Sequence, residues 1–245
     1  MRQFGLLGYP LTHSFSENYF NDKFLKEQIA DASYKSFPLE NLEYFPGLCV
    51  YEKNLSGLNV TIPYKQEILP YLDTIDPEAE RIGAVNTIKF TQGKKIGYNT
   101  DVYGFESSLM PMLENHHRFA LVLGTGGASK AVVHVLNKLG IDWKLVSSSM
   151  LNQNTISYTD IDTVLMKDAT LIINTTPLGM FPDISGAPEI PYSCITAKHL
   201  CYDLIYNPEE TTFLKLAKQY GAATKNGLEM LHLQAEKSWH IWNTP

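Results

Sequence analysis

F-A-L-V-L at residues 119–123 runs directly into G-T-G-G-A at 124–128, and together these ten residues say most about the architecture. Five apolar residues in a row are typical of a strand buried on both faces of a parallel sheet. Residues 129–139 then have a helical pattern, so the glycines form a tight turn between a strand and a helix. Backbone N–H groups at such a helix N-terminus can hold a pyrophosphate. The stretch predicts a dinucleotide-binding β-α-β unit, although a turn without a ligand has the same pattern.

The residues that follow repeat this alternation. Further elements are predicted as strands at 143–147, 171–174, 200–204 and 222–224, and as a helix at 209–220. Alternating strands and helices indicate a parallel sheet of the Rossmann type. After its second strand, a Rossmann fold usually has an acidic residue for a ribose hydroxyl or an arginine for a 2′-phosphate. Ser147, Ser148 and Ser149 occupy that place here, so charge alone does not choose between NADP and NAD.

The first hundred residues predict a second α/β unit. Its expected elements are strands at 3–8, 33–37 and 57–61, helices at 16–27 and 39–53, and a hairpin of 86–90 with 94–98 around Gln92-Gly93. This order predicts a mixed, mostly parallel sheet with helices packed on it. A helix at 102–113 then starts the Rossmann-like domain, and a helix at 227–242 closes the chain. We therefore expect an α/β protein of two domains, 1–101 with 228–245 and 102–227.

Composition limits the function classes. The chain has 245 residues, of which 44% are hydrophobic, and its net charge of −6 argues against nucleic acid or an anionic membrane as partner. Its N-terminus does not resemble a signal peptide, and no apolar run approaches the length of a membrane span. Three cysteines without paired spacing fit reduced thiols in a cytoplasmic protein. Seven scattered histidines without a metal-binding motif predict that no metal is bound.

Two short polar segments carry the chemistry. G-L-N-V-T-I-P-Y-K at 57–65 ends in Lys65, and G-Y-N-T-D at 97–101 ends in Asp101. Each segment also carries an Asn and a Thr, which can bond the hydroxyl groups of a ligand. If the fold brings the segments together, an ammonium and a carboxylate meet in a polar pocket, as proton transfer on a polyhydroxylated small molecule requires. A surface lysine that opens a helix and an aspartate that caps one remain the alternatives.

Taken with the glycine turn, the order of the motifs resembles the shikimate dehydrogenase family nearly end to end. Seven ordered segments carry this resemblance: G-Y-P-L-T-H-S-F-S at 8–16, the segment at 57–65, G-A-V-N-T at 83–87, the segment at 97–101, N-T-T-P-L-G-M at 174–180, D-L-I-Y-N-P at 203–208 and N-G-L-E-M-L-H-L-Q-A at 226–235. The resemblance implies a substrate domain and a Rossmann-like domain with a cleft between them, in a monomer or a homodimer. It also implies reversible NADPH-dependent reduction of 3-dehydroshikimate to shikimate, a step of chorismate and aromatic amino-acid biosynthesis.

The resemblance implies roles for individual residues as well. Lys65 would be the catalytic acid–base group, paired with Asp101. The residues expected to bind the hydroxyls and the carboxylate of shikimate are Ser14, Ser16, Thr61, Asn86, Asp101, Tyr206 and Gln234. Those expected to bind NADP are Gly124, Thr125, Gly126, Gly127, Ala128, Ser148, Leu204, Gly227 and Met230, the last three of them near the nicotinamide.

Three alternatives stay open. Ser148 stands where the family commonly has an arginine for the 2′-phosphate, so an enzyme that prefers NAD or also oxidises quinate fits the sequence. A cofactor-binding relative without catalysis is the second alternative, and the presence of Lys65, Asp101 and Gln234 together argues against it. A folate-linked dehydrogenase with a similar two-domain plan is the third. The serine-containing loop at 8–16 and the N-T-D segment favour a polyol acid as substrate over a folate.

Overall fold

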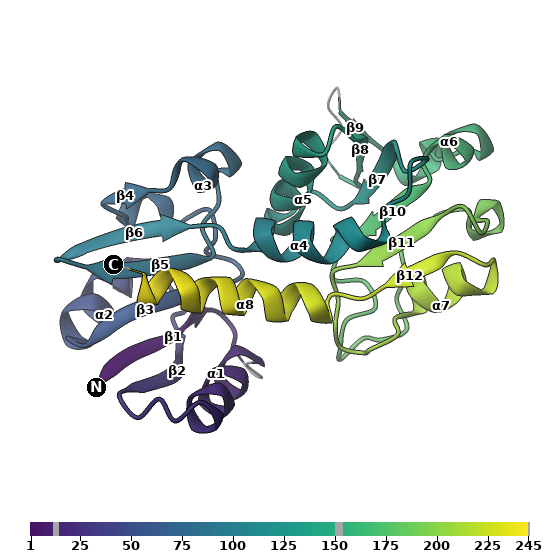
Figure 1. The fold of residues 1–245 in the computed structure, drawn as a ribbon. Helices are drawn as coiled ribbons and strands as arrows, with labels where there is room; N and C mark the ends of the chain where they lie inside the picture. The colour runs from purple at the N-terminus through teal and green to yellow at the C-terminus, as the bar shows by residue number, and fades with distance from the viewer. Residues whose placement is uncertain (12–14, 150–153, 245) are drawn as a thin grey trace. The chain divides into compact units, whose positions relative to one another are not determined.

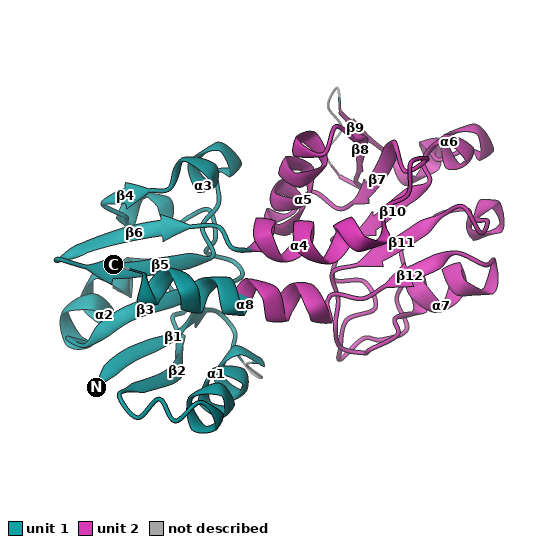
Figure 2. Ribbon diagram, viewed as in Figure 1, with its two compact units in different colours: residues 1–100, 235–245 teal, residues 101–234 magenta. Residues whose placement is uncertain are grey.

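The structure is a computed structural model that describes residues 1–11, 15–149 and 154–244 (Figure 1). The chain forms two compact units (Figure 2): unit 1 contains residues 1–100 and 235–245, and unit 2 contains residues 101–234. The first division lies one residue before the boundary expected at 101/102, and the second falls inside helix α8 (Leu228–Asn243) instead of at 227/228. The reason is that α8 serves both units, with Met230 packed in unit 2 and Trp242 in the core of unit 1.

Unit 1 is built on a six-stranded sheet in the order β2-β1-β3-β5-β6-β4. Its strands are β1 (Arg2–Gly8), β2 (Ala32–Pro38), β3 (Leu55–Val60), β4 (Thr74–Ile75), β5 (Thr87–Thr91) and β6 (Lys94–Tyr98). β5 is antiparallel to β3 and β6, and the other neighbouring pairs are parallel. The predicted mixed, mostly parallel sheet is therefore confirmed. The helices of this unit are α1 (Phe15–Lys26), α2 (Phe45–Tyr51), α3 (Pro77–Ile82) and the last part of α8.

The predicted hairpin joins β5 to β6, which pair in antiparallel register. Its turn residues Gln92 and Gly93 have φ angles of 50° and 74°, both in the left-handed region. Two such residues in succession form a type I′ turn, whose twist matches the right-handed twist of the strands. Gly93 adopts this conformation without steric cost and therefore favours a turn at this position.

The prediction of one helix over 39–53 is wrong in its extent. A 3-10 turn occupies Leu42–Tyr44, capped by Asn41, whose side chain accepts the N–H of Glu43, and α2 begins only after it. Pro46 lies in the first turn of α2, where its missing N–H is no loss, so it starts a helix instead of continuing one. The short elements β4 and α3 are not part of the prediction, because two and six residues carry little periodic pattern.

Apolar side chains pack on both faces of the unit 1 sheet. Consecutive residues Leu6 and Leu7 of β1 belong to different hydrophobic clusters, as the alternation of side chains along a strand requires. Trp242 of α8 closes one of these clusters, with its ring 4.9 Å from that of Phe4 and its indole N–H donating to the Ile88 carbonyl at 3.0 Å. Gly57 of β3 makes room for it, because a Cβ at that position would lie 2.3 Å from the indole nitrogen.

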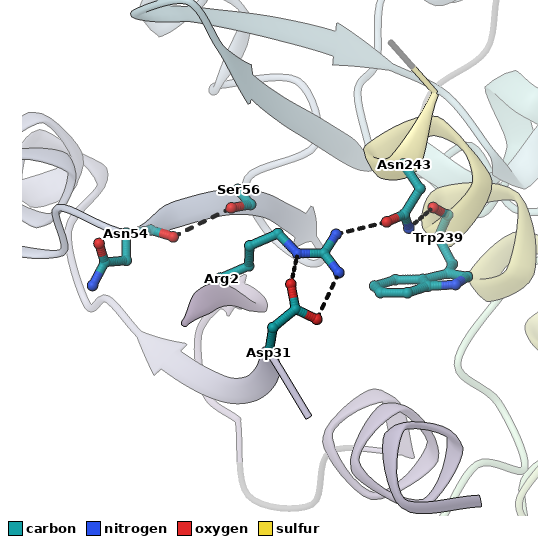
Figure 3. A network of polar contacts seen from close by, with 6 residues as sticks. All are labelled: Arg2, Asp31, Asn54, Ser56, Trp239 and Asn243. Atoms are coloured by element: carbon teal, nitrogen blue, oxygen red, sulfur yellow. Dashed lines mark hydrogen bonds and ion pairs between the residues drawn. The ribbon is translucent and has the colours of Figure 1, made fainter. Parts of the chain in front are cut away.

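Arg2 fastens the end of α8 to the first strand (Figure 3). Its guanidinium donates to both carboxylate oxygens of Asp31, at 2.8 and 3.1 Å, and to the Asn243 side chain at 2.6 Å. The same group lies over the rings of Phe4 and Trp239, at 5.5 and 5.6 Å from their centroids. The planar fork of arginine makes all of these contacts at once, which a lysine could not do.

Unit 2 contains a six-stranded, entirely parallel sheet in the order β12-β11-β10-β7-β8-β9. Its strands are β7 (Phe119–Leu123), β8 (Asp142–Val146), β9 (Thr155–Ile156), β10 (Leu171–Asn174), β11 (Leu200–Asp203) and β12 (Ala223–Lys225). Its helices are α4 (Asp101–Leu109), α5 (Gly127–Lys138), α6 (Thr163–Asp168), α7 (Thr212–Gln219) and the first part of α8. Counted along the chain, the strand order is that of a doubly wound Rossmann sheet, so this prediction is confirmed.

Two helices of unit 2 are shorter than expected, each for a local reason. α4 ends at Leu109 instead of 113, and a 3-10 turn containing Pro111 follows, because proline lacks the N–H that would continue the helix. α7 begins after Thr211 instead of at 209, because the Thr211 side chain caps it by accepting the N–H of Leu214. β9 and α6 are short additions that the sequence pattern does not predict.

Within the described ranges, none of the helices combines the length and the apolar character that crossing a membrane would need. The three cysteines, Cys49, Cys194 and Cys201, are free thiols. Burial raises the pKa of Cys49 to about 11 and that of Cys201 to about 12, so both thiols are protonated and unreactive at neutral pH.

Candidate active site

One edge of the unit 1 sheet gathers the polar segments of this unit. β1 and β3 are parallel neighbours, so both end at this edge, and the antiparallel β5 begins there. The loop after β1 contacts the segment after β3, since the N–H of Tyr9 donates to the Ile62 carbonyl at 3.2 Å. Gly8 permits this approach, because a Cβ there would lie 2.4 Å from the Thr61 methyl group. The edge thus carries Thr61, Lys65 and Asn86 together, and their role in substrate binding stays a prediction.

Lys65 stands on a turn that the backbone holds rigidly. The Thr61 N–H donates to the Leu7 carbonyl at 2.9 Å, and the Lys65 carbonyl accepts the N–H of Val85 at 2.7 Å. Tyr64, directly before the lysine, is buried in the core, whereas Lys65 itself is only half-buried. The Lys65 side chain is therefore presented from a fixed backbone position.

The amide of Asn86 has a defined orientation. Its oxygen accepts the backbone N–H of Thr100 at 2.7 Å, and its nitrogen donates to the Thr100 hydroxyl at 3.0 Å. A backbone N–H can only donate, so the oxygen must face Thr100. Because Asn86 is 3% exposed, water does not compete for these bonds. The Asn86 side chain is therefore locked before any ligand binds.

The serine loop is described only in part. Ser14 lies outside the described residues. Ser16, in the first turn of α1, is half-buried and forms a hydrogen bond with the Tyr34 hydroxyl. Burial raises the pKa of Tyr34 well above its usual value, so its hydroxyl stays neutral and keeps its proton for donation.

Unit 2 carries Asp101, Tyr206 and Gln234. Asp101 is the first residue of α4 and is buried, where a negative charge at a helix N-terminus is favourable. Gly104, one turn later, allows α4 to touch α8: a Cβ there would lie 2.6 Å from the Met230 carbonyl and 3.1 Å from the Gln234 Cβ. Asp101 and Gln234 thus stand on helices that pack backbone to backbone. Lys65 belongs to unit 1, so its pairing with Asp101 stays a prediction.

The glycine turn lies at the carboxyl edge of the parallel sheet, where β7 and β10 are neighbours. Strand order reverses between these two strands, which is the position where doubly wound folds bind ligands. Gly124 has a φ of 105°, and a Cβ there would lie 2.9 Å from the Thr175 hydroxyl and from the Thr176 methyl. Gly126 is the N-cap residue of α5, and no side chain of the described residues caps that helix. Its first N–H groups are thus suited to an anion.

The other predicted cofactor residues lie at the same edge. Ser148 follows β8 and is exposed, whereas Ser147 is buried and accepts the N–H of Ser149. Leu204 follows β11, and Gly227 is pressed against it: a Cβ on Gly227 would lie 2.0 Å from the Leu204 carbonyl oxygen. Met230 is buried and lies in the first turn of α8. Tyr206 is half-buried in the loop after β11, and burial raises its pKa.

Sequence reasoning missed a buried carboxylate at this edge. Asp203 ends β11 and accepts hydrogen bonds from the Thr211 hydroxyl at 2.6 Å, the Ile205 N–H at 3.0 Å and the Asn174 amide at 3.1 Å. Asn174 in turn accepts the N–H and the hydroxyl of Thr176. These bonds fix the loops after β10 and β11, including Leu204 and Tyr206. A charged residue at the end of the apolar run L-C-Y-D was the signal that could have revealed it.

Comparison with known proteins shows which family has this sequence and fold. The family model described as "Shikimate dehydrogenase substrate binding domain" matches residues 6–88. A shikimate dehydrogenase (NADP(+)) from Methanococcus maripaludis is 40% identical over 256 residues, which cover 97% of this chain and 90% of that protein. The chain belongs to the shikimate dehydrogenase family.

Solved structures agree with this family assignment. Shikimate 5-dehydrogenase from Thermus thermophilus in complex with NADP(H) and shikimate has a TM-score of 0.86 and 31% identity, covering 99% of this chain and 94% of that one. Quinate dehydrogenase from Corynebacterium glutamicum in complex with NAD also has a TM-score of 0.86, with 27% identity and coverage of 99% and 93%. The shikimate dehydrogenase fold thus accounts for nearly the whole chain.

Proposed function

We propose that this protein is an NADP-dependent shikimate dehydrogenase, which reversibly reduces 3-dehydroshikimate to shikimate. The observation that carries the proposal is that each unit collects its share of the predicted site at one sheet edge. Thr61, Lys65 and Asn86 lie together in unit 1, and the glycine turn and Leu204 lie together in unit 2. The names of similar proteins support the same reaction and the same cofactor.

The residues of unit 2 fit a dinucleotide. Gly124 packs its backbone against Thr175 and Thr176, where a Cβ would lie only 2.9 Å away, and the first N–H groups of α5, which no side chain of the described residues caps, are suited to bonding a pyrophosphate. Gly124, Thr125, Gly126, Gly127 and Ala128 would hold that group, and Ser148 would lie near the adenosine ribose. Leu204, Gly227 and Met230 would line the nicotinamide. NADP supplies or accepts the hydride when it is bound.

The protein's own groups then handle the proton. Lys65, as an ammonium group, would donate a proton to the ketone oxygen as the carbonyl carbon is reduced, and would take it back in the reverse direction. Asp101 would orient the lysine and accept a hydrogen bond from a neighbouring substrate hydroxyl. Asn86 and Gln234 would bond further hydroxyls, and the hydroxyl groups of Ser14, Ser16, Thr61 and Tyr206 would donate to the carboxylate.

One assay tests the function. The purified protein is incubated with shikimate or quinate, each with NADP⁺ and with NAD⁺, and reduced nicotinamide is followed by its absorbance. We expect the highest kcat/KM with shikimate and NADP⁺. Absence of turnover with all four pairs, combined with binding of NADP⁺ in calorimetry, would instead identify a cofactor-binding relative without catalysis.

A second candidate is an enzyme that prefers NAD and also oxidises quinate. It is favoured by Ser148, since a serine hydroxyl bonds a 2′-phosphate more weakly than a bidentate arginine does. The likeness to a quinate dehydrogenase in complex with NAD points the same way. The NAD⁺ arms of the assay decide: a kcat/KM for NAD⁺ above that for NADP⁺ would establish this candidate.

A further inference from the structure

A continuous chain of buried hydrogen bonds runs through unit 1. The Tyr34 hydroxyl donates to the Asn59 amide oxygen at 2.9 Å, and the Asn59 amide nitrogen donates to the Ser238 hydroxyl at 2.9 Å. Ser238 continues to the hydroxyl of Thr100 at 3.1 Å, and Thr100 holds Asn86 through two bonds. The chain therefore links β2, β3 and α8 to the end of β6 and the start of β5.

Both ends of this chain are predicted substrate groups. Ser16 bonds the Tyr34 hydroxyl at one end, and the Asn86 amide lies at the other. A second hydroxyl, that of Thr87, bonds Ser238 at 2.8 Å and the Asn86 amide oxygen at 3.1 Å. The path from Ser238 to Asn86 is thus doubled, which makes the orientation of Asn86 more strongly determined.

Every linking member of the chain is shielded from water. Ser238 and Thr87 are fully buried, and Tyr34, Asn59 and Thr100 are at most 5% exposed. The orientation of the Tyr34 side chain is also restricted by its ring, which stacks on that of Phe20 with 4.7 Å between the centroids. Buried groups that lose a partner cannot turn to solvent, so removal of the Tyr34 hydroxyl takes from the Asn59 amide oxygen the donor that Tyr34 supplies.

We propose that Tyr34 and Ser238 are positioning residues, which hold Ser16 and Asn86 in the geometry that binds the polyol acid through the buried chain Tyr34–Asn59–Ser238–Thr100. This role rests on the proposed function, because it assigns a purpose to two substrate groups. Both residues are shielded from solvent, since Tyr34 is 3% exposed and Ser238 is fully buried. Tyr34 bonds Ser16 and Asn59, and Ser238 links Asn59 to Thr100, which in turn bonds Asn86.

The test compares Tyr34→Phe with a matched control, Tyr202→Phe. Tyr202 is also a buried phenol bonded to a serine, since its hydroxyl lies 2.7 Å from that of Ser108, but this pair lies in unit 2. We expect Tyr34→Phe to raise the KM for shikimate about tenfold, the equivalent of roughly one lost hydrogen bond. Its KM for NADP⁺ stays within a factor of two, and Tyr202→Phe changes neither constant.

Ser238→Ala tests the same chain from α8 and serves if Tyr34→Phe does not fold. We expect a similar rise in the KM for shikimate. Because both residues act through one chain, the double variant should raise KM by less than the product of the two single effects. Two separate structural defects would multiply instead.

The outcomes separate the two proposals. If the wild type turns over neither shikimate nor quinate, the function fails and the positioning role fails with it. If the wild type is active and both folded variants keep its KM for shikimate, only the positioning role is overturned. A KM for NADP⁺ that rises as much as that for shikimate would also overturn it, because a general loss of structure produces that result.

Discussion

At the scale of single residues, substitution of Lys65 tests the proposed acid–base chemistry. Its turn is fixed by the Thr61 N–H, which donates to the Leu7 carbonyl, and by the Val85 N–H, which donates to the Lys65 carbonyl, so Lys65→Ala should fold normally. We expect kcat to fall by about 10²–10⁴, the usual contribution of a positioned acid–base group. The rate of NADPH formation at saturating shikimate measures this. Lys94→Ala, on the exposed hairpin, is the control, and turnover of Lys65→Ala equal to that control would remove the lysine from the mechanism.

A second prediction at this scale concerns Asp203 and the dependence of the stability of the fold on pH. Burial raises its pKa to about 6, although hydrogen bonds from Thr211, Ile205 and Asn174 work in the opposite direction. A carboxyl whose pKa is higher in the folded state stabilises the fold fully below its unfolded pKa of about 4. That contribution is lost as the pH rises through about 6.

Asp203→Asn removes this titration while keeping an oxygen for the bonds from Ile205 and Asn174. Between pH 4 and pH 7, the stability of the variant should therefore improve relative to wild type by about 3 kcal/mol, from a shift of roughly two pKa units. Urea unfolding of both proteins at several pH values measures the difference. A difference that is constant across this range would contradict the raised pKa.

The residues that could be recognised from the sequence differ from the others in whether their contacts are local along the chain. Lys65 and Gly124 could be found because their neighbours along the chain define their settings: a strand end, a turn, a helix start. Tyr34 and Ser238 could not, since their importance comes from Asn59, which is 25 positions from one and 179 from the other. A local pattern carries no information on such pairings.

At the scale of elements, the glycine turn between β7 and α5 gives a sharp test. In Gly124→Ala the new methyl group meets Thr175 and Thr176 at 2.9 Å, and the left-handed φ of 105° adds strain. We expect the KM for NADP⁺ to rise at least about tenfold. The turn must shift to make room for the methyl group, and even a small displacement of a binding group weakens its contacts with the ligand. The KM for shikimate should stay near that of the wild type.

Gly140→Ala is the matched control for this substitution. Gly140 also has a left-handed φ, 68°, but a Cβ there meets nothing within 4 Å. Its substitution should cost about 1–2 kcal/mol of stability through strain alone and leave the KM for NADP⁺ unchanged. Equal effects of the two substitutions on KM would mean that the turn does not approach the cofactor.

Elements were predictable where local chemistry is strong. The parallel strands of unit 2 follow from apolar runs, and the hairpin turn follows from Gly93, which is suited to left-handed backbone. The region 39–53 was misjudged because Pro46 permits a helix to start as readily as it ends one. Strand order in unit 1 needed tertiary information, since a two-residue strand, β4, completes the sheet.

At the scale of the whole molecule, the chain leaves unit 1 after Thr100 and returns to it at Ala235. Unit 1 is therefore complete only when the last eleven residues have been added to its first hundred. Trp242, Trp239 and Ala235 close the cluster around Phe4, and Ser238 completes the buried hydrogen-bonded chain. Unit 2 has a core of its own, around Leu121, Ile172 and Phe213.

Trp242→Ala tests whether these cores are separate cooperative units. Deletion of a buried tryptophan side chain lowers the free energy of unfolding by about 3–5 kcal/mol. The Ile88 carbonyl also loses the hydrogen bond from the Trp242 indole N–H. We expect hydrogen exchange to accelerate in β1, β3 and β5, with β7, β10 and β11 keeping their protection. Trp143→Ala is the control, because Trp143 lies on β8 of unit 2 and is half-buried, so its loss should spare unit 1. If Trp242→Ala instead lowered protection equally in both sheets, the two cores would unfold as one, and the division of the chain into units would carry no thermodynamic meaning.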